Sequence, residues 1–245
     1  MTRNYFYLFS ILSTVLIVNA KLPFSVETCS RDSDDYSSCL KILFQDIWSK
    51  ILPGVPELNI PKLQPYQVES GIYTFEISEI TAKINVENVI LHGLEKLVFQ
   101  SVKPNHGNDY FSLDFVFTIS DVFVEGDYKA SGALGSYRHS GQGKFNITVQ
   151  DMEAMVHLYG PVDTNDIWSI EEFHFKPEFG NMKFWASNIF KGNKDLTEAM
   201  LNLINSYWRN FVDGMMPLAE KNWNKSLAKI TNDGLKNIKF SDIFP

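Results

Sequence analysis

The segment YFSLDFVFTISDVFVEGDYKASGAL, residues 110–134, alternates apolar and polar residues as a long β-strand does. From Phe111 to Ile119 the apolar residues occupy odd positions, whereas Val122 and Tyr128 occupy even positions. Because neighbouring side chains of a strand point to opposite faces, this change of parity turns the apolar set to the other face unless a bulge absorbs it. The segment therefore predicts one long strand that bends strongly between residues 119 and 122.

A second segment, residues 144–160, carries the same signature. Its apolar residues are odd-numbered up to Val149 and even-numbered from Met152 onward. Alternation also marks residues 71–91, 167–179 and 182–190. Two long strands with matching changes of parity predict a strongly bent antiparallel sheet.

Two glycine-containing polar segments between the expected strands are typical of hairpin loops, namely KPNHGND at residues 103–109 and HSGQGK at residues 139–144. In the second, Gly141-Gln-Gly143 does not precede an expected helix, so it fails as a phosphate-binding loop.

Helical periodicity appears at both ends of the chain. Residues 40–52 place apolar groups at i, i+3, i+4 and i+7 spacing, and Pro53 ends the pattern. Near the carboxy terminus, residues 196–211 form a second amphipathic stripe, which Gly214 and Pro217 interrupt before it resumes. This predicts either two helices or one kinked helix, with Pro217 in a first helical turn. The tail FSDIFP is expected to be extended.

The resulting fold prediction is α+β, with a strongly curved antiparallel sheet around a long carboxy-terminal helix. A bent sheet has one apolar concave face and an amphipathic helix has one apolar stripe, so each buries the other. The aromatic content of 14% fits a large core. It also fits an apolar tunnel left between helix and sheet, and composition alone does not separate the two.

Residues 51–71 are rich in both proline and aliphatic side chains. Proline fixes φ and removes a hydrogen-bond donor, so the chain must be extended here. The aliphatic residues predict that this segment is a rigid, buried crossover from the first helix to the first strand.

The amino terminus resembles a secretory signal peptide at residues 1–20, with Arg3 before an apolar run that is too short for a spanning helix. We expect a single domain at residues 21–245. In an oxidising compartment Cys29 and Cys39 are expected to form a disulfide, with two free thiols as the alternative. Asn146 and Asn224 begin glycosylation sequons.

No recognisable catalytic motif stands out. The five histidines do not form a metal-binding pattern, and no nucleophile elbow is present in the sequence. Glu125 and Asp127 could converge on one strand face, although solvated charges are commoner. The formal net charge of −7 argues against a nucleic-acid partner. We therefore expect no enzyme, no cofactor and no metal.

Several motifs together resemble the takeout and haemolymph juvenile-hormone-binding protein family of insects. They are the two amino-terminal cysteines, LPGVPELNIPKLQPYQV, ENVILHGLEKLVFQSV, the central YKASGALGSYRHSGQGKFNITVQDMEA, NIFKGNKDLTEAMLNLINSYWRNF and the final FSDIFP. Glu95 stands where the family usually has serine. The resemblance implies a secreted, extracellular carrier, found in haemolymph or another extracellular fluid, that holds a juvenile-hormone-like terpenoid or another long-chain lipid in an apolar tunnel.

The side chains expected to contact this ligand are Phe44, Trp48, Phe115, Phe117, Tyr128, Phe145, Met200, Trp208 and Phe211, with core packing as the alternative for each. The Tyr128 hydroxyl could bind an epoxide or ester. We expect a hydrophobic small-molecule ligand, no stable membrane insertion and a monomer, and the sequence specifies no receptor. The alternative function is a secreted signalling or protein-interaction factor, of the circadian or feeding-related takeout type, with a filled cavity.

Overall fold

The structure is a computed structural model that describes residues 23–68, 70–77, 80–134 and 137–245. The predicted signal peptide at residues 1–20 lies outside the described residues. The elements are, in chain order, α1 (Tyr36–Ile51), the 3₁₀ helix η1 (Pro56–Leu58), β1 (Tyr66–Val68), β2 (Gly71–Ile77), β3 (Ile80–His92), the 3₁₀ helix η2 (Leu94–Lys96), β4 (Leu97–His106), β5 (Tyr110–Leu134), β6 (Tyr137–Pro161), β7 (Glu172–Ala186), α2 (Lys194–Ser206), α3 (Trp208–Leu235) and α4 (Phe240–Ile243).

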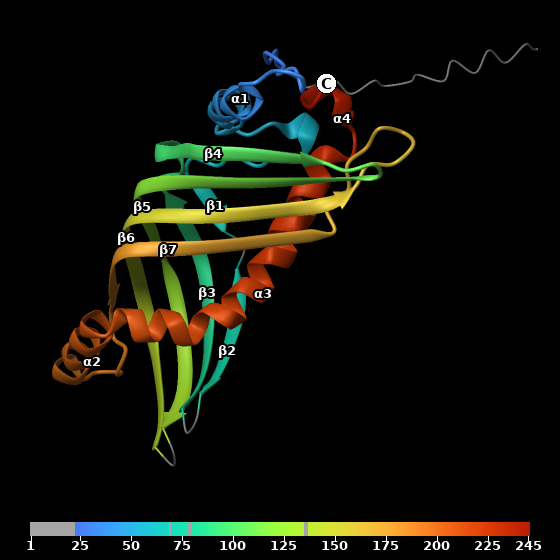
Figure 1. Cartoon of the computed structure of the whole chain (residues 1–245). Coiled ribbons are helices and arrows are strands. Elements are labelled where there is room, and N and C mark those ends of the chain that lie inside the picture. The colour runs from blue at the N-terminus through green and yellow to red at the C-terminus, as the bar shows by residue number, and fades with distance from the viewer. Residues whose placement is uncertain (1–22, 69, 78–79, 135–136) are drawn as a thin grey trace, which may run out of the picture.

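The strands form one antiparallel sheet with the long strands β5 and β6 at its centre (Figure 1). On one side β6 pairs with β7. On the other side β4 pairs with the first half of β5 and β3 pairs with its second half, while β1 and β2 both pair with β3. The α+β fold with a curved antiparallel sheet and a long carboxy-terminal helix is therefore confirmed.

β5, β6 and β7 bend at the same level, where the change of parity predicted a bend. Ile119 pairs with Met152, and pairing resumes in the same register at Asp121. Between these pairs lies Asp151, whose φ is +51°. On the next strand Gly180 lies so close that a Cβ there would be 2.8 Å from the Cβ of Asp151. A left-handed residue beside a glycine thus turns these strands without a bulge in their pairing.

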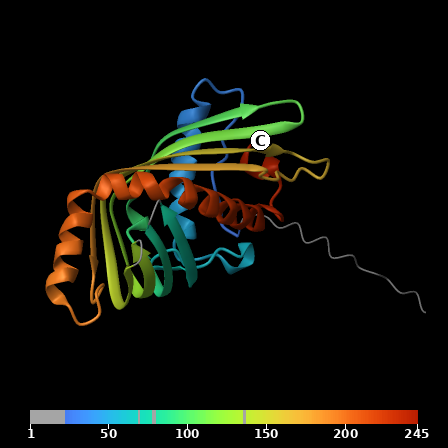
Figure 2. The same cartoon turned by 90° about the horizontal axis from the view of Figure 1, so that it is seen from below.

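The bend divides the sheet into two limbs (Figures 1 and 2). We call the proximal limb the part formed by β4, residues 110–119 of β5, 152–161 of β6 and 172–179 of β7. The distal limb consists of β1, β2, β3, residues 122–134 of β5, 137–149 of β6 and 181–186 of β7.

The concave side of the proximal limb is tightly packed. Leu40 and Leu43 of α1 join Phe111 of β5 and Phe244 near the carboxy terminus in one buried cluster. The ring centroid of Phe111 lies 4.6 Å from that of Phe244 and 4.8 Å from that of Phe240. The prediction of an extended tail at residues 240–245 is therefore wrong. A short helix, α4, directs both Phe240 and Phe244 into the core because residues four apart share a helix face.

The predicted disulfide between Cys29 and Cys39 is present, and it ties the amino-terminal segment to α1. The helix predicted at residues 40–52 is also confirmed, although α1 begins one turn earlier, at Tyr36. The proline-rich crossover is buried only in part, and the prediction that it is extended is wrong, because Pro56–Leu58 form η1 and Asn59 is left-handed. Val55 and Leu58 form a second small cluster with Ile238.

The prediction of a hairpin loop at residues 139–144 is wrong, because this segment lies inside β6. Gly141 and Gly143 serve a close approach of two backbones. A Cβ at Gly141 would lie 2.2 Å from the carbonyl oxygen of Ile189, and one at Gly143 would lie 2.7 Å from that of Ser187. The loop expected at residues 103–109 does connect β4 to β5, but the strands leave only residues 107–109 for the turn.

The helical break also differs from the prediction. α2 ends at Ser206 and α3 begins at Trp208, so the break falls at Tyr207, whereas α3 continues through Pro217. The break lies two residues after Asn205. The side chain of Asn205 donates a hydrogen bond to the carbonyl oxygen of Phe184 in β7 (2.9 Å) and accepts one from the backbone amide of Phe184 (2.8 Å). This contact fixes the end of α2 to β7.

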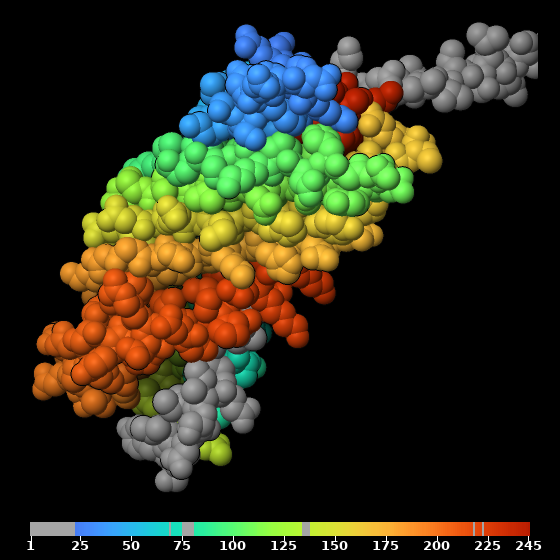
Figure 3. Space-filling view, viewed as in Figure 1, coloured from blue at the N-terminus to red at the C-terminus, as the bar shows by residue number. Residues whose placement is uncertain are grey.

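α2 and α3 run along the open edge of β7 (Figures 1 and 3). Besides Asn205, Arg209 donates to the carbonyl oxygen of Gly180 (3.0 Å) and Asn224 accepts from the amide of Phe175 (3.0 Å). Asn232 both accepts from and donates to the backbone of Ile170, at 2.7 and 2.8 Å. These side chains form hydrogen bonds with backbone groups at the edge of β7 and in the segment before it. A further strand would otherwise pair with these groups.

Candidate functional site

The concave face of the distal limb is apolar but incompletely covered. After the bend, Val122 and Val149 are still buried, at 7% and 6% exposure. The residues of the same parity farther along the strands, and their partners on β3 and β7, are only half-buried. They are Val124, Tyr128, Phe145, Ile147, Ile84, Val86, Met182 and Phe184. We call these residues the distal concave face.

The proximal limb differs sharply on the same side of the sheet. Phe111, Leu113 and Ile119 are each 1% exposed, because α1, α4 and the neighbouring strands pack against them. In Figure 2, α3 passes between the two limbs and covers the bend from the β7 side. An apolar surface that lies inside a curved sheet and keeps partial exposure can accept an apolar molecule.

Glycine shapes the floor of the distal concave face. Gly126 lies opposite Phe145, and a Cβ there would be 3.0 Å from the ring of Phe145 and 3.0 Å from a methyl group of Val89. The missing side chain leaves room for the Phe145 ring against the sheet.

Tyr128 has its hydroxyl group engaged within the protein. It donates to the carbonyl oxygen of Ser187 at 2.8 Å, and burial raises the pKa of this phenol. The bond ties β5 to the segment that follows β7. Because the hydroxyl proton is already donated to Ser187, it is not free to bind an epoxide or ester as expected, although the hydroxyl oxygen can still accept a hydrogen bond.

The residues predicted as ligand contacts fall into three groups, which the structure does not bring together at one point. Phe44, Trp48, Phe115 and Phe117 belong to the core of the proximal limb or its margin. Phe44 lies 5.7 Å from Phe99 and 6.1 Å from Phe115 between ring centroids, and the Trp48 indole donates to the carbonyl oxygen of Leu94 (2.8 Å).

The second group, Tyr128 and Phe145, lies on the distal concave face. The third group is on the carboxy-terminal helices. There, Met200 and Trp208 are half-buried, Phe211 is 42% exposed, and the guanidinium of Arg209 lies 4.3 Å from the centre of the Trp208 ring system.

Sequence reasoning missed Phe175 and passed over Trp223 as an ordinary helix residue. The two rings meet edge to face at 5.4 Å, and Phe175 stacks on Phe117 at 6.3 Å. This places the α3 indole over the concave side of the sheet. The alternation along β7 would have identified Phe175 as inward-facing, but only the tertiary structure brings Trp223 to it.

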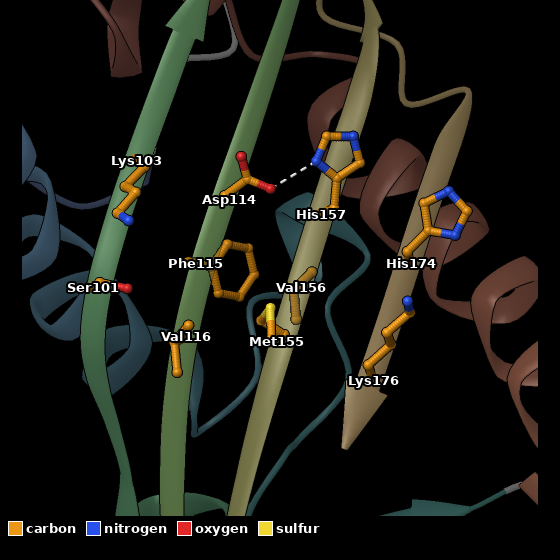
Figure 4. Close-up of a pocket in the computed structure, with 10 residues that line it drawn as sticks. All are labelled: Ser101, Lys103, Asp114, Phe115, Val116, Met155, Val156, His157, His174 and Lys176. Carbon is orange, nitrogen blue, oxygen red and sulfur yellow. Dashed lines mark hydrogen bonds and ion pairs between the residues drawn. The ribbon is translucent and has the colours of Figure 1, made fainter. Parts of the chain in front are cut away.

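The outer face of the sheet carries two charged depressions. The larger, of about 470 Å³, lies across the proximal limb, and in Figure 4 Asp114 and His157 point toward each other from β5 and β6, 2.7 Å apart. Val116 and Met155 form its apolar part. The smaller, of about 380 Å³, is lined mainly by charged and amide side chains of the distal limb, including Glu87 and Lys144. Neither resembles an enclosed apolar site.

The acidic residues considered for catalysis lie on this outer face with partners of their own. Glu125 lies 3.7 Å from the imidazole of His92. Asp127 accepts from Asn88 and from Lys144, and these hydrogen bonds lower the pKa of the carboxyl group. Within the described part of the chain, no group of three or more His, Cys, Asp or Glu side chains is arranged to hold a metal ion.

The two sequons lie in different environments. Asn146 is on β6, with its neighbours Glu125 and Trp185 on the adjoining strands. Asn224 is on α3 and uses its amide oxygen to bind the backbone of β7. Glycosylation at either position stays a prediction.

Comparisons with known proteins agree with this geometry. The sequence model of the haemolymph juvenile hormone binding protein family matches residues 7–245. Circadian clock-controlled protein daywake of Drosophila yakuba is 22% identical over 222 residues, which cover 84% of this chain and 83% of the relative. The same protein of Drosophila melanogaster is 21% identical over 219 residues.

Among solved structures, the crystal structure of Epiphyas postvittana Takeout 1 superposes with a TM-score of 0.72 and 20% sequence identity, covering 89% of this chain and 99% of the other. At this identity the likeness shows a shared fold. None of the helices within the described ranges combines the length and the apolar character needed to cross a membrane.

Proposed function

Because this chain belongs to the haemolymph juvenile hormone binding protein family, we propose that it binds a hydrophobic small molecule between the distal concave face and the carboxy-terminal helices. The observation that carries this proposal is the half-buried apolar surface inside the bend, next to a proximal limb in which Phe111, Leu113 and Ile119 are almost completely buried. The ligand class is a juvenile-hormone-like terpenoid or another long-chain lipid.

Apolar burial alone supplies enough free energy for such binding. A chain of about 15 carbons, buried at about 0.8 kcal/mol for each methylene, contributes at most about 12 kcal/mol. Association costs of about 4 kcal/mol or more reduce this gain. The net gain of at most about 8 kcal/mol corresponds to a dissociation constant of about 1 μM. The proposed activity is carriage of the ligand, without catalysis.

The same proposal includes export and transport in an extracellular fluid. The apolar run at residues 5–18 and the disulfide between Cys29 and Cys39 support it, because disulfides persist in oxidising compartments. The two daywake relatives are named as circadian clock-controlled. We propose that the carrier is likewise under rhythmic control, which a time course of its transcript would test.

Native mass spectrometry of the protein secreted by its own tissue, followed by solvent extraction, tests the carrier function. We expect a small apolar compound in stoichiometric amount. Protein that is empty, and that also fails to take up terpenoids and fatty acids, would instead favour a signalling or protein-interaction role.

A matched pair of variants on β6 locates the site. Phe145 and Met155 are both odd-numbered, yet the bend places Phe145 on the concave face and Met155, 59% exposed, on the outer face. We expect Phe145→Ala to weaken binding of a C16 fatty acid by about tenfold or more, since it removes apolar contact area. Met155→Ala should leave the affinity unchanged. Equal affinities for the two variants, measured by titration calorimetry, would place the ligand elsewhere.

A further inference from the structure

The indole of Trp223 is held rigidly on the concave side of the bend. Its ring meets Phe175 edge to face at 5.4 Å, and Phe175 stacks in turn on Phe117. The adjacent Asn224 accepts a hydrogen bond from the amide of Phe175 at 3.0 Å, so α3 is fixed to β7 at this point. Phe175 and Phe117 both belong to the proximal limb, so Trp223 packs on the concave side of the sheet on the proximal side of the bend.

The indole N–H of Trp223 is buried and has no hydrogen-bond partner among the described residues. Two other indoles of the chain do have hydrogen-bond partners. Trp48 donates to the carbonyl oxygen of Leu94 at 2.8 Å, and Trp168 donates to that of Gly160 at 3.2 Å. A buried donor without an acceptor costs free energy, and such groups are rare in folded proteins. A donor left in this state next to a ligand-binding surface has an explanation if the ligand supplies the acceptor.

We propose that the Nε1–H of Trp223 is a polar anchor for the ligand, and that the ligand is a long apolar molecule bearing a neutral acceptor oxygen, such as an ester, ketone or ether. This inference rests on the proposed function. Indole is an uncharged donor, and it provides no counter-charge that would offset the burial of a carboxylate. An acceptor oxygen of the ligand would give this N–H the hydrogen bond that it lacks in the free protein.

Competition between two probes of matched length tests the anchor. The secreted protein, and its Trp223→Phe and Trp168→Phe variants, are each equilibrated with an equimolar mixture of methyl hexadecanoate and heptadecane. The bound fraction is then extracted and quantified by gas chromatography. Because each variant meets the same mixture, differences in probe solubility cancel when the ester-to-hydrocarbon ratios are compared.

We expect Trp223→Phe to lower the bound ester-to-hydrocarbon ratio by about tenfold, the value of one well-made hydrogen bond. Trp168→Phe should leave the ratio unchanged. In urea denaturation without ligand, Trp223→Phe should lower the midpoint less than Trp168→Phe does, because both variants lose apolar contact but only Trp168→Phe breaks an existing hydrogen bond.

Two results would overturn the anchor while leaving the carrier function intact. One is an ester-to-hydrocarbon ratio that is the same in Trp223→Phe and wild type. The other is a urea midpoint of ligand-free Trp223→Phe that falls as far as that of Trp168→Phe, which would indicate that the donor already has a partner. Failure of the wild type to load either probe would instead count against the proposed function itself.

Discussion

Gly141 marks the point where the segment after β7 crosses over β6. Side chains are excluded there because a Cβ would lie 2.2 Å from the carbonyl oxygen of Ile189, a backbone atom with little freedom to move. The glycine is thus required by a close approach between strands and not by a turn. The hydrogen bond from Tyr128 to Ser187 and this close approach both join the segment after β7 to the strands next to the proposed site.

We expect Gly141→Ala to destabilise the protein by about 1–3 kcal/mol through overpacking. Gly234 provides the control, since it lies in α3 with its nearest neighbouring atom 3.8 Å from a built Cβ. Gly234→Ala should stabilise by about 0.5–1 kcal/mol, because alanine favours the helix. Urea denaturation measures both, and a neutral Gly141→Ala would contradict the close approach.

His106 lies at the contact between α1 and the β4–β5 hairpin, where its protonation should make the stability of the fold depend on pH. Its ring Nε2 lies 3.2 Å from the Tyr36 hydroxyl, and burial, followed by the nearby Arg31, lowers the pKa of His106 below its ordinary value of 6.5. The unfolded chain therefore binds this proton more readily than the folded protein does. Stability should fall as the pH drops below about 6.5.

Thermal unfolding between pH 7.5 and 5 tests this sign. We expect the melting temperature of the wild type to fall more than that of His106→Gln, which cannot take up the proton. The effect should be modest, because the ring is partly exposed. The ion pairs of His92, His157 and His174 remain in both proteins and cancel in the comparison. Identical pH profiles would exclude His106 as the source.

At the scale of elements, α2 and α3 take the place of a strand along the edge of β7. Apolar burial contributes little to this attachment within α3, whose described residues are at most half-buried. Side-chain amides from Asn205, Asn224 and Asn232 bind the backbone instead. A helix held in this way lies along the open edge of β7.

Asn232 offers the sharpest test of this attachment, because it satisfies both the amide and the carbonyl of buried Ile170. We expect Asn232→Ala to destabilise by about 2–3 kcal/mol, since it leaves two buried backbone groups unpaired. Asn210, exposed on the same helix, is the control, and Asn210→Ala should change stability by less than about 0.5 kcal/mol. Equal urea midpoints for the two variants would refute the role given to Asn232.

At the scale of the whole molecule, one bend produces two limbs of the same sheet with different packing. The proximal limb is filled by α1 and α4, which the disulfide and Arg31 hold in place, the latter through hydrogen bonds to the carbonyl oxygen of Phe244. On the concave side of the distal limb, α3 passes between the two limbs (Figure 2). The more completely buried apolar residues thus lie in the proximal limb, whereas the proposed ligand site lies in the distal limb.

The sequence by itself determined the elements that rest on local periodicity. The bend between Ile119 and Val122, the helix α1 and the amphipathic carboxy-terminal region all follow from the spacing of apolar residues, which local geometry dictates. The cysteine pair was likewise readable, because a short loop and an oxidising compartment favour its disulfide.

The tertiary structure alone decided what each apolar face meets. Phe44 and Phe117 were indistinguishable in sequence from Phe145, yet the first two lie at the proximal core and the third on the distal concave face. The roles of Gly141 and Trp223 depend on partners about fifty residues away in the chain, namely Ile189 and Phe175. Periodicity reports which side of an element is apolar, whereas packing between distant segments determines whether that side is filled.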